Sequence, residues 1–271
     1  MIRAVLAAAA VAAALIGTAA TAVAASSPAD RLPATRQARD TPPSRECRPG
    51  SCTVPARYRD YDGFLAWTRD DLRATWTALF RRARVPFTAP KLVIVSGDRT
   101  VASACSREQI GRDAPVGPIY CAGDGPGTVY LPTTSLQRIV FEGVPDFRLR
   151  NYATRDFAFS VVVAHEWAHH LQAVLGRRDP VFRLRGPHIR VELQADCLAG
   201  VWARSAWRRA LLDGTDIPEA VRVASNAGDR PGVAPGDPRA HGTGAQRRTW
   251  FSRGFDRGTV SSCDTRRVPL A

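Results

Sequence analysis

Residues 165–172 have the sequence HEWAHHLQ, in which His165 and His169 are four positions apart and Glu166 follows the first. On an α-helix, residues at this spacing differ by about 40° in direction and one turn in height. Two imidazole nitrogens placed side by side in this way suit a single tetrahedral Zn²⁺. Glu166 flanks that position, where a carboxylate can take a proton from metal-bound water and pass it to a leaving group. The motif therefore predicts a hydrolytic zinc site.

An alternative is that these side chains are satisfied by ordinary hydrogen bonds inside a buried helix. The chain has 5 histidines, and random placement of so few gives the HExxH pattern in roughly one sequence in a hundred or fewer. The motif also falls in the most apolar helix that the sequence predicts, where imidazoles and a carboxylate without partners would be costly. We therefore favour the metal site.

A hydrolytic zinc needs a third protein ligand and one open position. ELQAD, residues 192–196, places Glu192 and Asp196 on one face of a helix. We expect Glu192 to bind the metal and Asp196 to accept a hydrogen bond from the outer nitrogen of a ligand histidine. The alternative is a solvated acidic pair at a helix start. The stripe of small residues that continues this face predicts close packing against the His165 helix; it consists of Ala195, Ala199, Gly200 and Ala203.

Hydrophobic periodicity predicts the elements that position these residues. Thr154 is a candidate N-cap for a helix that is apolar on nearly every side and ends at Gly176. We expect the remaining helices at 60–85, 188–214, 217–228 and 244–255, a buried strand at 91–97, and two neighbouring strands at 117–121 and 128–132. The Gly/Pro-rich segment between the last two helices is predicted to be a loop. About two hundred residues are enough for one domain with a substantial core.

The N-terminal segment has the composition of a secretory signal peptide. Residues 1–25 combine a basic start, an Ala-rich apolar run and a small-residue cleavage site. An uncleaved membrane anchor is the competing interpretation. Residues 26–57 are rich in Pro, Ser and Arg and are predicted to be a disordered tether, which leaves 58–271 as the folded domain. We expect the mature protein to be secreted or extracytoplasmic, and to meet a membrane only if this segment is not cleaved.

Cysteine content and charge agree with export. The 6 cysteines are an even number, as in an oxidising compartment. Sequence position makes three pairs plausible among the fifteen pairings that six cysteines allow: Cys47 with Cys52, Cys105 with Cys121, and Cys197 with Cys263. The net charge of +13 is almost entirely due to arginine. Such a surface attracts anionic cell-envelope polymers or lipid head groups before nucleic acid, although a solvated basic face explains the charge equally well.

Several segments together resemble the neutral zinc metallopeptidase family of bacterial envelope and secreted proteins. They are HEWAHHLQ, ELQADCLAGVWA, HGTGAQRRTWFSRGF and CDT, with GPIYCAGDGPGTVYL upstream, and they span roughly residues 58–265. The resemblance implies an α+β, zincin-like fold, mostly helical with a small sheet. It also implies a gluzincin-type peptidase with one Zn²⁺ per chain, held by His165, His169 and Glu192, and with Glu166 as catalytic base. It favours the Cys105–Cys121 and Cys197–Cys263 disulfides.

The sequence departs from the family pattern at two places. The family usually has an acidic residue shortly after the YL strand, where this chain has Pro132, Thr133 and Thr134. The aromatic residue that commonly follows CDT is replaced by Arg266. The first departure bears on the substrate groove, and hence on specificity or activity.

The remaining histidines and two tyrosines are candidates for smaller roles. An oxyanion must also be stabilised, and we assign this role to His241, with Tyr120 and Tyr130 as alternatives; a plain loop residue is the competing interpretation of His241. Tyr130 could also belong to an edge strand that pairs with an extended substrate, or to an ordinary sheet strand. We interpret His170 as a packing residue and His188 as a surface residue.

Two functions are consistent with these features. The first is a secreted zinc endopeptidase that hydrolyses peptide bonds with Glu166 as general base. The second is a non-enzymatic zincin-like module that binds anionic cell-envelope polymers. The presence of Glu166 favours the enzyme, because a purely structural metal site needs no base.

Overall fold

A computed structural model describes residues 61–115, 117–140, 156–184 and 186–269. The predicted signal peptide and tether, Cys47, Cys52 and the proposed cap Thr154 lie outside the described residues.

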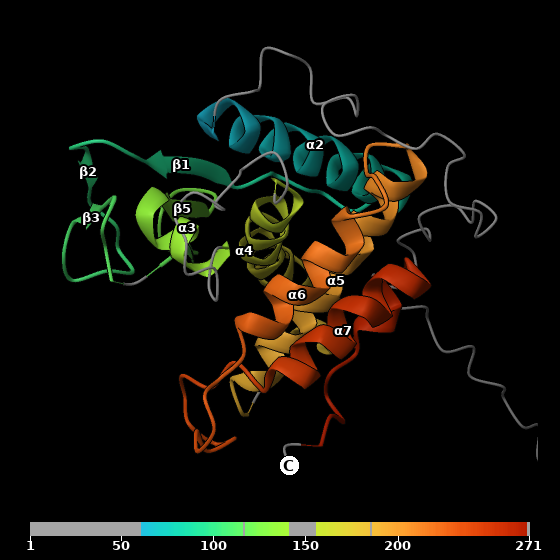
Figure 1. Cartoon of the computed structure of the whole chain (residues 1–271). Helices are drawn as coiled ribbons and strands as arrows, with labels where there is room; N and C mark the ends of the chain where they lie inside the picture. Colours follow the sequence, from blue (N-terminus) through green and yellow to red (C-terminus); the bar gives the residue numbers. More distant parts are fainter. Residues whose placement is uncertain (1–60, 116, 141–155, 185, 270–271) are drawn as a thin grey trace, which may run out of the picture.

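Helices make up most of the described chain, and the fold is α+β, as the sequence predicts (Figure 1). The α-helices are α2 (Tyr61–Arg82), α3 (Thr133–Val140), α4 (Asp156–Gly176), α5 (Ile189–Arg208), α6 (Asp216–Asn226) and α7 (Gly244–Arg257). Short 3₁₀ turns are η4 (Pro180–Phe182) and η5 (Val260–Cys263). None of the described helices combines the length and apolarity that crossing a membrane requires.

A three-stranded sheet lies beside the helices, in the order β1-β5-β4. Strand β5 (Thr128–Pro132) is central, with β1 (Lys91–Val95) parallel to it and β4 (Ile119–Cys121) antiparallel. Strands β2 (Thr100–Val101) and β3 (Ile110–Gly111) form a separate pair. The expected neighbours 117–121 and 128–132 are confirmed. Of the two interpretations of Tyr130, the ordinary sheet strand is confirmed, because β5 is paired on both sides and the edge strands of this sheet are β1 and β4.

Helix α4 occupies the centre of the molecule (Figure 1). It contacts α2 and the sheet on one side and α5 and α6 on another. Trp167 and Leu171 on α4 are fully buried, as are Trp76 on α2 and Trp202 on α5. An apolar surface on nearly every side of α4 is what a helix surrounded by other elements needs. The α4 side chains that the sequence assigns to the metal site therefore belong to a helix that is packed on several sides.

Two helix assignments from the sequence need correction. Helix α5 ends at Arg208 rather than near Gly214. Ala210 adopts a left-handed conformation, with φ of 55°, and the Leu211 N–H bonds to the Ala206 carbonyl at 3.2 Å. This is a Schellman-type ending, here without the glycine that signals it in a sequence. Helix α3 was not predicted, because its eight residues are too few for a clear periodic pattern.

One small residue of α5, Gly200, faces a different neighbour from the one predicted. A Cβ added at Gly200 would collide with the backbone of Phe251 and Phe255 in α7, and one added at Gly254 in α7 would collide with the Cys197 carbonyl. The expectation that Gly200 faces the His165 helix is therefore wrong. Close backbone approach at these two glycines brings α7 against the face of α5 that also bears Asp196.

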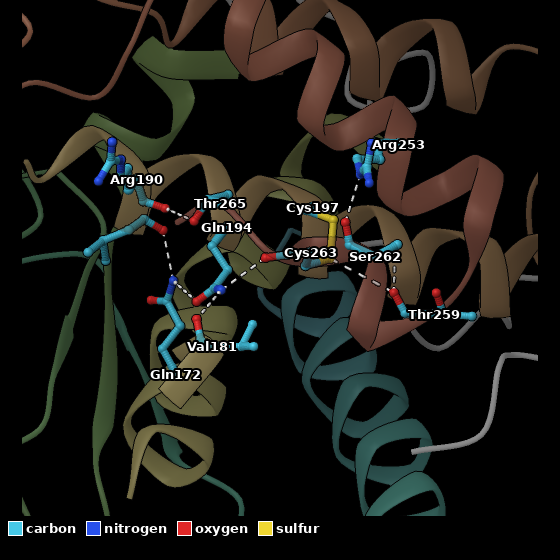
Figure 2. Close-up of a disulfide and its surroundings, with 11 residues drawn as sticks. Gln172, Val181, Arg190, Gln194, Cys197, Arg253, Thr259, Ser262, Cys263 and Thr265 are labelled. Atoms are coloured by element: carbon cyan, nitrogen blue, oxygen red, sulfur yellow. Dashed lines mark hydrogen bonds between the residues drawn. A yellow bond between two sulfur atoms is a disulfide. The ribbon is translucent and has the colours of Figure 1, made fainter. Parts of the chain in front are cut away.

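Two disulfides link the elements near the cavity described below. Cys105–Cys121 fixes the end of β4, with Cα atoms 5.6 Å apart. Cys197–Cys263 joins α5 to η5, with Cα atoms 5.5 Å apart (Figure 2). Both pairings are confirmed.

Candidate metal centre

The three predicted ligands meet in space. His165 and His169 project from α4, and Glu192 projects from the first turn of α5. Their ligand atoms all lie within 4.8 Å of one another. The carboxylate of Glu192 is 3.1 Å from Nε2 of His165 and 3.5 Å from Nε2 of His169. Two imidazoles and one carboxylate converging in this way are a suitable donor set for zinc.

Each ligand histidine has a hydrogen-bond partner on its outer nitrogen. Nδ1 of His165 lies 2.9 Å from Oδ1 of Asp196, and Nδ1 of His169 lies 2.8 Å from Oε1 of Gln172. Ligand histidines typically donate their outer N–H to an acceptor, which leaves Nε2 for the metal. The predicted contact of Asp196 is confirmed, whereas the contact of Gln172 was not predicted. Both imidazoles are therefore held in an orientation that fits a metal ion between Nε2 and Glu192.

A buried arginine from α7 completes the surroundings of Asp196. Arg247 is 5% exposed, and its Nε and Nη2 each donate to a different oxygen of Asp196 at 2.8 Å. Its Nη1 donates to the Ala227 carbonyl at 2.7 Å. The sequence does not predict Arg247 as a partner of Asp196, although a buried carboxylate requires a cation nearby. The guanidinium of Arg247 thus neutralises the charge of Asp196, the acceptor that orients His165.

The charges of this cluster are set by its own members. Burial opposes ionisation of Asp196, but Arg247 holds the pKa of this carboxyl below its usual value. Burial likewise opposes ionisation of Glu192, and His169 and His165 lower its pKa in net. Burial alone would lower the pKa of His165, but Asp196 and Glu192 raise it to about 10. Both carboxylates are therefore ionised and act as acceptors, and metal binding must displace the proton that His165 holds without a metal.

A cavity of about 700 Å³ opens onto the three ligands. Glu166 is half-buried and lines the same cavity as the three ligands. Ile119 and Tyr120 of the edge strand β4 form another wall, and apolar side chains from α4, α5 and α6 form the rest, including Val162, Val191 and Val223. The cavity therefore combines a polar metal end with an apolar wall and an edge strand.

His241 and His188 lie next to each other at the cavity. Their rings make an edge contact at 5.8 Å between centroids, and both line the cavity. Nδ1 of His241 is 3.5 Å from Oδ1 of Asp229. Nε2 of His188 is 3.4 Å from Oε1 of Glu192, so the interpretation of His188 as a mere surface residue is wrong. The catalytic role of His241 stays a prediction, supported by its place at the cavity.

The two tyrosines are separated by the structure. The hydroxyl of Tyr130 donates to Asp124 at 2.8 Å, and Tyr130 is not among the residues lining the cavity. The hydroxyl of Tyr120 lies 3.1 Å from Nδ1 of His170, whose Nε2 is 2.7 Å from the Thr88 carbonyl. His170 is confirmed as a packing residue that ties α4 to β4. Tyr130 is thus excluded as an oxyanion donor by its position.

The fold and the site define a zincin-like α+β protein, with HExxH on one helix and a third donor on the next. The chain belongs to the family described as "Putative neutral zinc metallopeptidase", whose model matches residues 5–266. Uncharacterized protein YpfJ of Escherichia coli is 34% identical over 216 residues, which cover 74% of this chain and 68% of the relative. Uncharacterized protein Rv2575 of Mycobacterium tuberculosis is 32% identical over 223 residues, covering 73% and 68%. No solved structure matches the chain.

Proposed function

We propose that the protein is an exported zinc endopeptidase that binds one Zn²⁺ through His165, His169 and Glu192. The observation that supports this most strongly is the meeting of three donors from two helices at one end of a cavity that Glu166 also lines. Three protein ligands leave a fourth tetrahedral position for water or substrate, as in hydrolytic zinc sites.

Glu166 is the general base in this proposal. When bound, zinc supplies Lewis acidity, which lowers the pKa of a water and polarises a carbonyl. Glu166 accepts the proton of the attacking water and returns it to the amine that leaves. Asp196 and Gln172 accept the outer N–H groups of His165 and His169 and so orient both rings toward the metal position. His241, which lines the cavity beside His188, is our candidate for stabilising the oxyanion.

The edge strand β4 offers a binding mode for the substrate. β4 hydrogen-bonds only to β5 within the described sheet, and its residues Ile119 and Tyr120 line the cavity. An extended peptide can add to such an edge through main-chain hydrogen bonds. This role replaces the one that the sequence suggested for the strand of Tyr130. A protein or peptide is therefore the substrate class that we propose.

Export is part of the proposal. The disulfides Cys105–Cys121 and Cys197–Cys263 support an oxidising compartment, where such bonds persist. The signal-peptide composition of residues 1–25 supports the same destination. A cell fractionation that recovers the mature chain only from the cytoplasm would contradict it.

Peptidase activity is tested by following casein and a quenched peptide library with the purified protein. We expect turnover that a chelator abolishes and that added Zn²⁺ restores, with zinc bound at one per chain. A basic surface that binds anionic polymers is the competing function. One zinc per chain without turnover of any peptide would favour that binding module.

Glu192→Ala is expected to remove most of the bound zinc, because two imidazoles on one helix form an incomplete site. Disulfides and packing elsewhere should keep the domain folded. Metal analysis after dialysis, with circular dichroism alongside, measures both. Glu108→Ala, an exposed glutamate outside the cavity, is the control. Unchanged zinc content in Glu192→Ala would show that the third ligand is another residue.

A further inference from the structure

Two buried glutamines lie behind the candidate metal centre. Gln172 on α4 is 8% exposed, and Gln194 on α5 is fully buried. Figure 2 shows both amides between the Cys197–Cys263 disulfide and the start of α5. Burying an amide is costly unless its donors and acceptors find partners. Their hydrogen bonds therefore reveal what the two side chains do.

The nitrogen of each amide is fixed by carbonyl oxygens. Nε2 of Gln194 donates to the carbonyls of Val181 at 3.1 Å and Cys263 at 2.9 Å. Nε2 of Gln172 donates to the Val191 carbonyl at 2.8 Å and to Oε1 of Gln194 at 3.2 Å. A backbone carbonyl can only accept. Rotating either amide by half a turn would therefore set oxygen against oxygen, so each amide has one favoured orientation.

The side-chain oxygen of Gln172 faces His169, one of the proposed metal ligands. Oε1 of Gln172 lies 2.8 Å from Nδ1 of His169, and an amide oxygen can only accept. The proton of a neutral His169 must then be on Nδ1, which leaves the lone pair of Nε2 directed at the metal position. The direction of every hydrogen bond in this series follows from the backbone carbonyls of Val181, Val191 and Cys263, which can only accept.

The far end of the series is anchored by the C-terminal segment. Cys263 is bonded to Cys197 on α5, only one turn beyond Gln194. Oγ1 of Thr265 donates to the Arg190 carbonyl at 2.8 Å, a second link between this segment and α5 that does not involve the amides (Figure 2). The carbonyl of Cys263 is thus held in place for Gln194.

We propose that Gln172 and Gln194 form an amide relay that fixes the metal-binding tautomer of His169. Both are positioning residues, since Gln194 acts through Gln172 and neither occupies the proposed coordination shell. The relay rests on the proposed metal centre for its purpose, but its hydrogen-bond directions do not depend on peptidase activity. It is the neutral counterpart of the charged pair Asp196 and Arg247 behind His165.

The first test reads the tautomer directly. In the metal-free full chain at mildly alkaline pH, long-range ¹H–¹⁵N correlation spectra distinguish an imidazole protonated on Nδ1 from one protonated on Nε2. We expect neutral His169 to be protonated on Nδ1 in the wild type. In Gln194→Met the Nε2-protonated tautomer should gain population, because Gln172 loses one of the two acceptors that set its orientation and keeps only the Val191 carbonyl. A wild-type His169 protonated mainly on Nε2 would overturn the relay.

The second test measures the zinc dissociation constant by competition with a chromophoric chelator. Loss of an outer partner of a ligand histidine typically weakens metal binding by about 10- to 100-fold, which we expect for Gln172→Met. Gln194→Met should weaken zinc binding by about tenfold although it does not contact His169. The double variant should be no weaker than Gln172→Met, because residues of one network are not additive.

The matched control is Arg267→Met, which alters an exposed residue of the same C-terminal segment without touching either amide. It should change the zinc dissociation constant by less than about twofold, within the range of neutral substitutions. A folded Gln194→Met with wild-type zinc affinity would overturn the relay. If Gln194→Met does not fold, the relay is judged from the tautomer of His169 in the wild type. If the wild type binds no zinc, the proposed function fails, while the tautomer still judges the relay.

Discussion

Glu166→Gln is expected to lower kcat/KM for peptide hydrolysis by about 10³-fold, within the range that general acid–base catalysis contributes. The amide has nearly the same shape as the carboxylate, so the cavity and its ligands should persist. It cannot accept a proton from water, and it cannot return one to the leaving amine. The measurement is steady-state kinetics on a quenched peptide, together with zinc analysis of the same preparation.

The zinc content separates this result from damage to the site. Glu166→Gln should retain one zinc per chain, since Glu166 lines the cavity without belonging to the ligand cluster. Glu108→Gln, in the exposed loop before β3, should have wild-type kinetics. Equal activity of Glu166→Gln and the wild type would remove Glu166 from the mechanism, and turnover would then require a different base.

Arg247→Met is expected to lower the free energy of unfolding of the metal-free protein by about 3–5 kcal/mol, the usual loss when one partner of a buried ion pair is removed. Methionine fills much of the space of the arginine stem, but the buried carboxylate of Asp196 would lose the guanidinium that bonds both of its oxygens. Arg247 would no longer hold the Asp196 carboxylate in the orientation that accepts from His165, so zinc binding should weaken as well. Urea unfolding followed by circular dichroism measures the change in stability.

A second substitution distinguishes charge from packing. Asp196→Asn combined with Arg247→Met removes both charges, and it should recover a large part of the lost stability because no unpaired charge stays buried. Arg248→Met, which alters an exposed arginine in the same turn, should change stability by no more than about 0.5 kcal/mol. If the double variant is as unstable as Arg247→Met, packing around the guanidinium rather than charge stabilises this region.

The sequence could predict the parts of the site that local spacing determines. His165 and His169 are placed by the period of one helix, and the pairing of His165 with Asp196 follows from the needs of a ligand imidazole. Arg247 could not be found this way, because it is 51 positions from Asp196 and no local pattern distinguishes it from the many other arginines. Gln172 and Gln194 escaped for the same reason, since their partners come from four separate segments.

The helices and strands show the same difference between what local spacing predicts and what tertiary contacts decide. The strongly apolar α4 and the neighbouring strands β4 and β5 follow from periodicity and turn residues. The sequence left open whether Tyr130 lies on an edge strand, because nothing in a sequence states that β1 pairs beside β5 across more than thirty intervening residues. Gly200 was assigned to the wrong neighbour because small residues indicate close packing but not the partner. Tertiary pairing decides both, and it is not encoded locally.

Asp196 and Gln172, the hydrogen-bond partners of the two ligand histidines, depend in turn on groups from the last part of the chain. Asp196 is neutralised by Arg247, and the amide of Gln194 ends on the carbonyl of Cys263. A chain that lacks this final segment would have the HExxH helix, Gln172 and Asp196, but neither Arg247 nor the carbonyl of Cys263. The C-terminal segment therefore contributes to the metal site although it carries none of the proposed ligands, and a chain truncated before it is expected to bind zinc more weakly.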